Sequence, residues 1–360
     1  MDFDRHMSDN EALMWNLEKD PALSSWFASI SITDDVPSID RLKVRLEHAV
    51  ATIPRLRQRV VASVGRMSPP MWVDDQQFDL DFHVRRMALP APGGEEELHE
   101  LAVKLLLDPF ERTRPLWQFV VIEGLSGGRG ALFQKMHHTI TDGEGGVRMA
   151  EQFVDLTRDA PDPTPIPMPD PVAPPSNFVE AAGEVVAHNT RRFGGLAARA
   201  VRNVVGDPAG SAAGVGAVLG ELRRALRPSD KEGEIVGSPL WQPRTMRRWY
   251  GTITVPLDDL KRAGKALGGT VNDAFVAGAL TGAARYHADR LATVDRFRVA
   301  MPVSTRSGGG AGGNQFALTT NDLSPAVDPV DAFAIVRDGL AAAKSGGSVD
   351  ILGSLSMIIN

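Results

Sequence analysis

Apolar residues recur at helical spacing between positions 38 and 53, where the chain reads SIDRLKVRLEHAVATI. Leu42, Leu46 and Val50 fall on one face of a helix, and the proline that follows is a helix stop. The stretch GEEELHELAVKLLLDP at 94–109 repeats this pattern and has glutamates in its first turn, where the helix dipole favours negative charge. The pattern predicts two amphipathic helices that pack on a sheet.

Shorter apolar runs predict strands. WFASISI occupies residues 26–32, and LWQFVVIE at 116–123 is joined to ALFQKMH at 131–137 by the glycine-rich segment GLSGGRG. We expect the last two runs to form a hairpin that delivers His137 and His138 to the end of a strand. In the second half, YGTITVPL, FRVAMPVS and FALTTND read as strands, with helices over 271–287 and near 330–344.

A proline-rich segment separates the two halves. Residues 161–175 read PDPTPIPMPDPVAPP, a composition that favours an extended polyproline conformation over helix or sheet. We therefore predict an N-terminal lobe at 1–159, a linker at 160–176 and a C-terminal lobe at 177–360. The alternation of strands and helices in both halves predicts an α/β (α+β) protein.

Composition excludes several classes of protein. The formal net charge of −6 gives no global electrostatic reason to expect nucleic acid as a partner. The absence of cysteine excludes disulfides, iron–sulfur clusters and a cysteine nucleophile. Because the sequence has no apolar run of membrane-spanning length and no signal-like N-terminus, we expect a cytoplasmic protein with no membrane span.

The segment after the linker is basic and helical in pattern. Arg192, Arg199 and Arg202 share one side of a helix whose other side carries Phe193, Ala197, Ala200 and Val204. Such a helix either covers the second lobe with a solvated outer face or rests on an anionic membrane surface.

Two glycine motifs resemble catalytic loops but lack the required context. Gly124, Ser126 and Gly128 match GxSxG, yet a nucleophile elbow needs a helix after the serine, and here a strand is predicted. The GxGxxG pattern at 308–313 also precedes a predicted strand, whereas a dinucleotide site needs a helix N-terminus. We interpret both as loops between strands.

The stretch QKMHHTITDGEGG at 134–146 is the strongest candidate for chemistry. A metal site needs three or four converging ligands, but adjacent residues at a strand end point in opposite directions, and no His-rich partner segment exists. Acid–base chemistry needs only one imidazole placed to take a proton from a hydroxyl or amine. The alternative is that both histidines are structural, which leaves the spacing of Asp142 and Gly143 unexplained.

HHTITDG at 137–143 resembles the HHxxxDG signature of chloramphenicol acetyltransferases, carnitine acyltransferases and peptide-synthetase condensation domains. Further matches narrow this resemblance. They are PLW at 115–117, Asn272 with Asp273, PVSTR at 302–306 and GNQF at 313–316. With these motifs, the chain from about Met7 onward resembles the bacterial wax ester synthase/diacylglycerol acyltransferase family.

The resemblance implies two chloramphenicol-acetyltransferase-like lobes with mixed sheets and a channel between them. It implies transfer of a fatty acyl group from acyl-CoA, a co-substrate, to diacylglycerol or a long-chain alcohol. His138 would be the general base, with His137 beside it in the catalytic motif, and no metal or cofactor would be needed. We also expect peripheral contact with the inner membrane face or with lipid droplets.

Supporting roles follow from the same resemblance. Asp142 is implied to form a structural salt bridge with Arg306 or Arg148, and PLW is expected to pack beneath the channel. A backbone N–H near Gly143 and the amide of Asn272 are candidate donors to the oxyanion. The spacing of Thr270 and Asp273 instead predicts a capping box that begins a helix.

The family normally continues beyond the point that matches Asn360, so we expect a second lobe that is incomplete at its C-terminus. This leaves two other functions open. One is a non-catalytic lipid or acyl-CoA binding relative, and the other is an acyltransferase with an amine or polyketide acceptor, because acceptor choice depends on channel shape.

Overall fold

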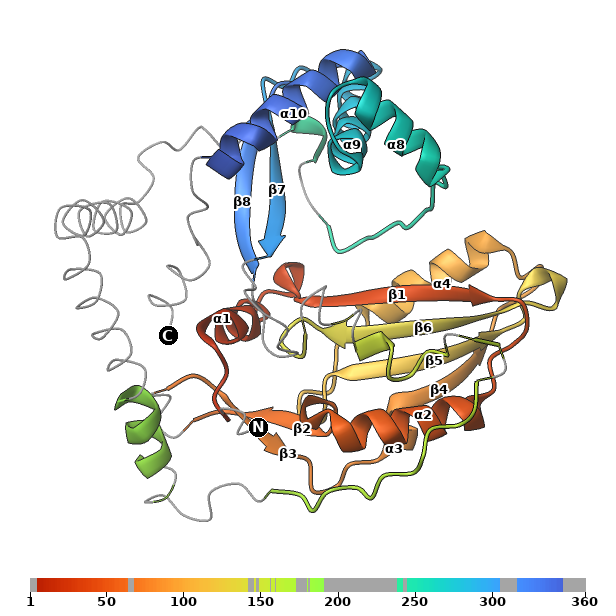
Figure 1. Ribbon diagram of the computed structural model, residues 1–360, viewed down its shortest axis with the longest axis vertical. Helices are drawn as coiled ribbons and strands as arrows, with labels where there is room; N and C mark the ends of the chain where they lie inside the picture. Colours follow the sequence, from red (N-terminus) through yellow and green to blue (C-terminus); the bar gives the residue numbers. More distant parts are fainter. Residues whose placement is uncertain are drawn as a thin grey trace.

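The computed structural model describes residues 5–63, 68–141, 146, 149–155, 157–158, 160–172, 180, 182–190, 238–241, 245–304 and 316–345. Figure 1 shows regular structure in two bodies, one built from the N-terminal half and one from residues after 238. Each body combines a sheet with helices, so the predicted α/β class with mixed sheets is confirmed.

The elements of the N-terminal lobe are, in chain order, α1 (Asp9–Leu17), β1 (Trp26–Thr33), α2 (Ile39–Thr52), β2 (Gln58–Val61), β3 (Met71–Asp74), α3 (Leu80–His83), β4 (Val84–Ala88), α4 (Glu95–Leu107), β5 (Trp117–Glu123) and β6 (Gly130–His137). Short 3₁₀ turns are η1 (Pro21–Leu23), η2 (Pro54–Leu56) and η4 (Ser126–Gly128). The predicted strand at 26–32, the two amphipathic helices and the hairpin are all confirmed. Helices α1 and α3 and strands β2 to β4 are additional elements.

The main sheet has the strand order β1-β6-β5-β4. Strands β5 and β6 are antiparallel, as the hairpin prediction requires, whereas β4 and β5 are parallel. Strand β6 is hydrogen-bonded on both sides, with His137 opposite Trp26 of β1. The candidate histidines therefore lie at the end of a central strand, where the backbone is held from two directions.

Helices cover both faces of this sheet, and the alternation of β5 explains how. Trp117, Phe119 and Val121 pack in the cluster that contains the buried side of α2. Val120 and Ile122 point to the other face, into the cluster that contains the buried side of α4. A strand that is buried on both faces reads as a continuous apolar run, which is the pattern seen at 116–123.

The proline-rich segment lies along the N-terminal lobe. From Ala160 to Val172 it has no helix or strand, and it passes beside α2 (Figure 1). Arg45 donates to the carbonyl of Pro161 at 2.8 Å, and the backbone N–H of Val172 donates to Asp74 at 2.9 Å. The described part of the segment is thus tied to the first lobe at both ends.

The second lobe contains η5 (Pro239–Trp241), α8 (Leu257–Ala266), α9 (Val271–Ala288), β7 (Phe297–Ser304), β8 (Phe316–Leu323) and α10 (Pro329–Ser345). Strands β7 and β8 are antiparallel, and α9 and α10 share one buried core with them. The helices predicted over 271–287 and near 330–344 are confirmed, as are the strands FRVAMPVS and FALTTND. The basic segment at 192–204 lies outside the described residues.

The prediction of a strand at YGTITVPL, residues 250–257, is wrong. Residues 250–256 have no regular secondary structure, and all of them are exposed. Threonine, isoleucine and valine favour strands, but a strand also needs a neighbour to complete its hydrogen-bonded ladder. Within the described part of the chain, no strand pairs with this segment.

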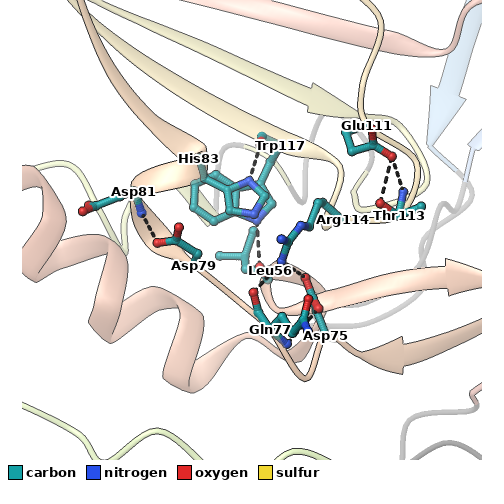
Figure 2. Close-up of polar contacts among 10 residues, drawn as sticks. All are labelled: Leu56, Asp75, Gln77, Asp79, Asp81, His83, Glu111, Thr113, Arg114 and Trp117. Atoms are coloured by element: carbon teal, nitrogen blue, oxygen red, sulfur yellow. Dashed lines mark hydrogen bonds and ion pairs between the residues drawn. The ribbon is translucent and has the colours of Figure 1, made fainter.

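A buried aromatic cluster supports the start of β5 (Figure 2). Trp117 donates from Nε1 to the carbonyl of Leu56 at 2.7 Å, and its own carbonyl accepts from Nδ1 of His83 at 2.8 Å. The His83 and Trp117 rings stack with centroids 4.3 Å apart. Arg114 and Asp75 form an ion pair at 3.2 Å beside them. The PLW motif is therefore core packing in this lobe.

His83 makes the stability of this cluster sensitive to pH. Burial lowers the pKa of His83 to about 4, and no described residue offers an acceptor to its Nε2. Between pH 6.5 and pH 4, His83 therefore binds a proton in the unfolded chain but not in the folded protein. The free energy of unfolding is highest above pH 6.5 and decreases as the pH falls through this range.

We predict that this histidine alone removes about 2 kcal/mol of unfolding free energy between pH 7 and pH 5. His83→Asn keeps a donor for the Trp117 carbonyl but does not titrate, so its pH profile should be flatter by that amount. Urea unfolding of both proteins at the two pH values measures the difference. Parallel profiles would contradict the assignment.

Candidate functional site

The site begins where β6 ends. The backbone N–H of His137 donates to the carbonyl of Leu116 at 3.0 Å, on the β5 side. The backbone N–H of His138 donates to the carbonyl of Ser25 at 2.8 Å, on the β1 side. Because consecutive residues are held from opposite sides, the two side chains have different surroundings, as the strand geometry predicts.

His137 is enclosed and fully hydrogen-bonded. Its side chain is 1% exposed, and Nε2 lies 2.5 Å from a carboxylate oxygen of Glu18. Nδ1 accepts from the backbone N–H of Thr139 at 3.0 Å and lies 2.7 Å from the Thr139 hydroxyl. An Nδ1 that accepts an N–H carries no proton, so the proton of the neutral ring is on Nε2 and points at Glu18. Both ring nitrogens of His137 are therefore engaged within the protein.

Glu18 stands at the end of α1 and connects three segments. The same oxygen that contacts His137 accepts from the backbone N–H of Ser25 at 2.9 Å. Burial raises the pKa of Glu18, but the hydrogen bond from His137, together with Ser25 and Arg112, outweighs it and leaves the pKa below its usual value. Glu18 is therefore an anion that holds the end of α1 against the start of β1 and the end of β6.

His138 is more accessible than His137. Its side chain is partly exposed, and its ring lies 4.6 Å from the ring of Phe27, centroid to centroid. A Cβ added to Gly146 would lie 3.9 Å from Phe27 and 3.7 Å from Thr141. Gly146 therefore lies beside Phe27, whose ring is a neighbour of the His138 ring.

Several predicted site residues lie outside the described residues. They are Asp142, Gly143, Arg148 and Arg306. The salt bridge of Asp142 with either arginine and the N–H donor near Gly143 therefore stay predictions. In the described part of the chain, no group of His, Asp and Glu side chains has the geometry to hold a metal ion.

Asn272 and Asp273 have different roles at the start of α9. Asp273 accepts from the backbone N–H of Thr270 at 2.7 Å, and the Thr270 hydroxyl accepts from the Asp273 N–H at 3.3 Å. The predicted capping box is confirmed. Asn272 is exposed and lines a hollow of 430 Å³ between α9 and β7, together with Trp241, Phe275 and Phe297. All residues that line this hollow belong to the second lobe, so it does not bring Asn272 to His138.

Four residues of the site were not predicted from the sequence: Glu18, Ser25, Phe27 and Thr139. Thr139 could have been predicted from its position. A threonine two residues after a side chain with a hydrogen-bond acceptor often donates a hydrogen bond back to that side chain within a turn. Glu18 is 119 residues from His137, and nothing in its local pattern points to that partner. Figure 1 shows how the fold joins them, with α1 lying beside the β6 end of the sheet.

Comparison with known proteins identifies the relatives of this chain. Residues 7–275 match the model of the wax ester synthase/diacylglycerol acyltransferase catalytic domain. A Mycobacterium tuberculosis protein named as a diacylglycerol O-acyltransferase is 33% identical over 357 residues, which cover 97% of this chain and 71% of the relative. A second M. tuberculosis protein with that name is 31% identical over 312 residues, covering 83% of this chain and 63% of the relative.

Solved structures agree on the fold. The wax ester synthase/diacylglycerol acyltransferase from Marinobacter aquaeolei VT8 superposes with a TM-score of 0.58 at 20% identity, over 95% of this chain and 72% of that one. The first condensation domain of the calcium-dependent antibiotic synthetase gives 0.56 at 17% identity, over 98% and 78%. At these identities the likeness concerns the two-lobed architecture alone.

The family match covers both the lobe with the paired histidines and the start of α9, and the sequence relatives span nearly the whole chain. The chain therefore belongs to the wax ester synthase/diacylglycerol acyltransferase family of acyltransferases.

Proposed function

We propose that this protein transfers a fatty acyl group from acyl-CoA to the hydroxyl of diacylglycerol or a long-chain alcohol, with His138 as the general base. The observation that carries the proposal is the contrast between the two histidines. Glu18 and Thr139 engage both ring nitrogens of His137, whereas the ring of His138 is partly exposed at the same strand end. His137 then acts as a positioning residue.

The chemistry balances without an acyl-enzyme. His138 takes the proton of the acceptor hydroxyl as its oxygen forms a bond to the thioester carbonyl carbon. The carbon–sulfur bond then breaks, and the protonated imidazole returns the proton to the departing thiolate. Positioning of two substrates next to one base supplies the remaining rate enhancement. No side-chain nucleophile is required, and Ser126 lies on the turn η4 between β5 and β6, far along the strands from the histidines.

The acceptor follows from the family and from the names of the relatives. Both M. tuberculosis relatives are named as diacylglycerol O-acyltransferases, which supports diacylglycerol as an acceptor. Both product types, triacylglycerol and wax ester, come from the same attack of a hydroxyl on a thioester. Such acceptors reside in lipid phases, so we propose peripheral contact with a membrane or lipid droplet. In the described residues, no helix is both long and apolar enough to cross a bilayer.

The test of the base is His138→Ala, assayed by acceptor-dependent release of the CoA thiol from palmitoyl-CoA. Loss of a general base lowers turnover by about 100-fold to 10,000-fold. The matched control is His48→Ala, which removes a partly exposed histidine of α2 whose Nδ1 donates to the carbonyl of Thr164 at 3.2 Å, and it should retain parental turnover. Equal turnover of the His138 variant and the control would contradict the assignment.

Acceptor choice is tested with the parent protein. Thiol release should rise above background with diacylglycerol or hexadecanol. Release only with amines would show an acyltransferase with another acceptor, and acyl-CoA binding with no release would show a non-catalytic relative. Either outcome would contradict the proposed acceptor chemistry.

Glu18→Gln tests the positioning role of His137. The amide keeps an oxygen that can accept from His137, but the charge is lost, so we expect kcat to fall about tenfold with little change in the KM for acyl-CoA. Stability should fall by about 1–3 kcal/mol at pH 7, since a charged hydrogen bond to a buried group is lost.

The stability difference between Glu18→Gln and the parent also has a predicted pH dependence. A carboxyl whose pKa is lowered on folding stabilises the protein above its ordinary pKa of 4.5, and that stabilisation is lost as the pH falls through the folded value. Urea unfolding should therefore show the difference shrinking towards low pH. A Glu18 variant with parental kcat would contradict the positioning role.

A further inference from the structure

Residues 245–257, hereafter the junction segment, expose more apolar surface than a folded protein normally leaves to water. Trp249 is 89% exposed and Ile253 is 94% exposed. Met246, Tyr250, Val255 and Leu257 are between 42% and 55% exposed. Single exposed apolar residues are ordinary, but a contiguous run of them marks a site of interaction.

The junction segment lies where the two lobes approach each other. It connects η5 with α8, on the side of the second lobe that faces α4 of the first (Figure 1). The ring of Tyr250 meets the ring of His99 on α4 edge to face, with centroids 4.8 Å apart. The exposed side chains are therefore beside the junction of the lobes.

Two adjacent cations precede the aromatic pair. Arg247 and Arg248 are exposed, and among the described residues no carboxylate lies within ion-pairing distance of either guanidinium. Their contacts stay inside the turn, where the backbone N–H of Arg247 donates to the Thr245 hydroxyl and Arg248 donates to the Thr245 carbonyl at 3.0 Å. Within the described structure, the segment therefore places two positive charges without a carboxylate partner next to Trp249.

Gly251 sets the position of the Trp249 indole. A Cβ at Gly251 would lie 2.3 Å from the edge of that ring, so glycine is needed for the indole to rest on the backbone there. Gly251 meets only the edge of the ring, and the side chain is 89% exposed, so the faces of the ring are open to solvent. An aromatic ring with one free face is a platform on which a second planar ring can stack.

We propose that the junction segment is a binding site for acyl-CoA, an inference that rests on the proposed function. Arg247 and Arg248 would pair with CoA phosphates, Trp249 would stack on the adenine, and Ile253 and Val255 would contact the alkyl chain. The two positive charges complement the CoA phosphates, and the adenine is joined to those phosphates through a single ribose, so adjacent residues can reach both groups. The exposed Trp249 ring favours this ligand over an anionic lipid surface, because CoA has a planar base that can stack on the ring and phospholipid headgroups have none.

The experiment is calorimetric titration of the full chain with CoA and with 3′-dephospho-CoA. Arg247→Gln/Arg248→Gln should weaken CoA binding about tenfold and should reduce its dependence on salt. Trp249→Ala should weaken the binding of CoA and of 3′-dephospho-CoA about fivefold, because both ligands contain the adenine that would stack on the indole. Arg262→Gln/Arg290→Gln removes the same charge from exposed sites of the same lobe and should bind CoA as the parent does.

Three outcomes would overturn the inference. One is equal CoA affinity in Arg247→Gln/Arg248→Gln and in the control pair. The second is unchanged CoA affinity with loss of binding to phosphatidylglycerol vesicles, which would assign the segment to a lipid surface. The third is unchanged CoA affinity with loss of a dimer in Ile253→Ser, measured by sedimentation, which would assign the segment to a second copy of the chain.

The inference and the proposed function can fail separately. Binding is measured without an acceptor, and His138→Ala should bind CoA like the parent. A protein that binds CoA through the junction segment but never releases thiol would contradict only the proposed function. Thiol release with a parental KM for acyl-CoA in Arg247→Gln/Arg248→Gln would contradict only the inference.

Discussion

The hydrogen-bond chain from Glu18 through His137 to Thr139 is the constraint on which the site depends. It is buried, it carries a carboxylate, and it joins the end of α1 to the end of the central strand β6. Ser25 extends it, because its N–H donates to Glu18 while its carbonyl accepts from the N–H of His138. One carboxylate thus fixes the ring of the first histidine and, through Ser25, the backbone of the second.

This arrangement gives two adjacent histidines different tasks. A buried imidazole with both nitrogens satisfied is a scaffold, and breaking it leaves polar groups unpaired in the core. The neighbouring ring is then presented from a backbone that is held on both sides by β1 and β5. Rigid support of this kind is what a general base needs, since small displacements of a reacting group lower the rate steeply. In the proposed mechanism, the fold would position the backbone of His138 and leave its ring partly exposed.

Much of this fold could be predicted from the sequence, because its main elements have strong periodic patterns. Helices α2 and α4 show their buried faces at helical spacing, and the apolar runs of β5 and β6 with glycines between them predict a hairpin. The capping box of Thr270 and Asp273 was also predictable, because all its contacts are local. These features depend on residues a few positions apart.

Other features depend on partners distant in sequence, so local patterns could not reveal them. Glu18 meets His137 only after the sheet has formed. Lys135 is buried, although lysine is normally exposed, because its ammonium reaches the carbonyl of Leu105 near the end of α4 and lies over the ring of Phe110. The prediction for the segment at 250–256 was wrong because a strand was expected where none forms. Its residues favour a strand, but strand formation requires a neighbour, and in the described structure the segment is exposed beside α4.

The central claim is that the hydrogen bonds of His137 fix its proton on Nε2, and that in the proposed reaction His138 is the histidine that acts on the substrate. Nitrogen-15 NMR of the histidine rings at pH 7 tests this most directly, with His137→Gln and His138→Gln variants to assign the signals. The account predicts that the His137 ring shows a single tautomer protonated at Nε2, and that Glu18→Ala removes this preference. A His137 ring protonated at Nδ1, or one unaffected by Glu18→Ala, would contradict it.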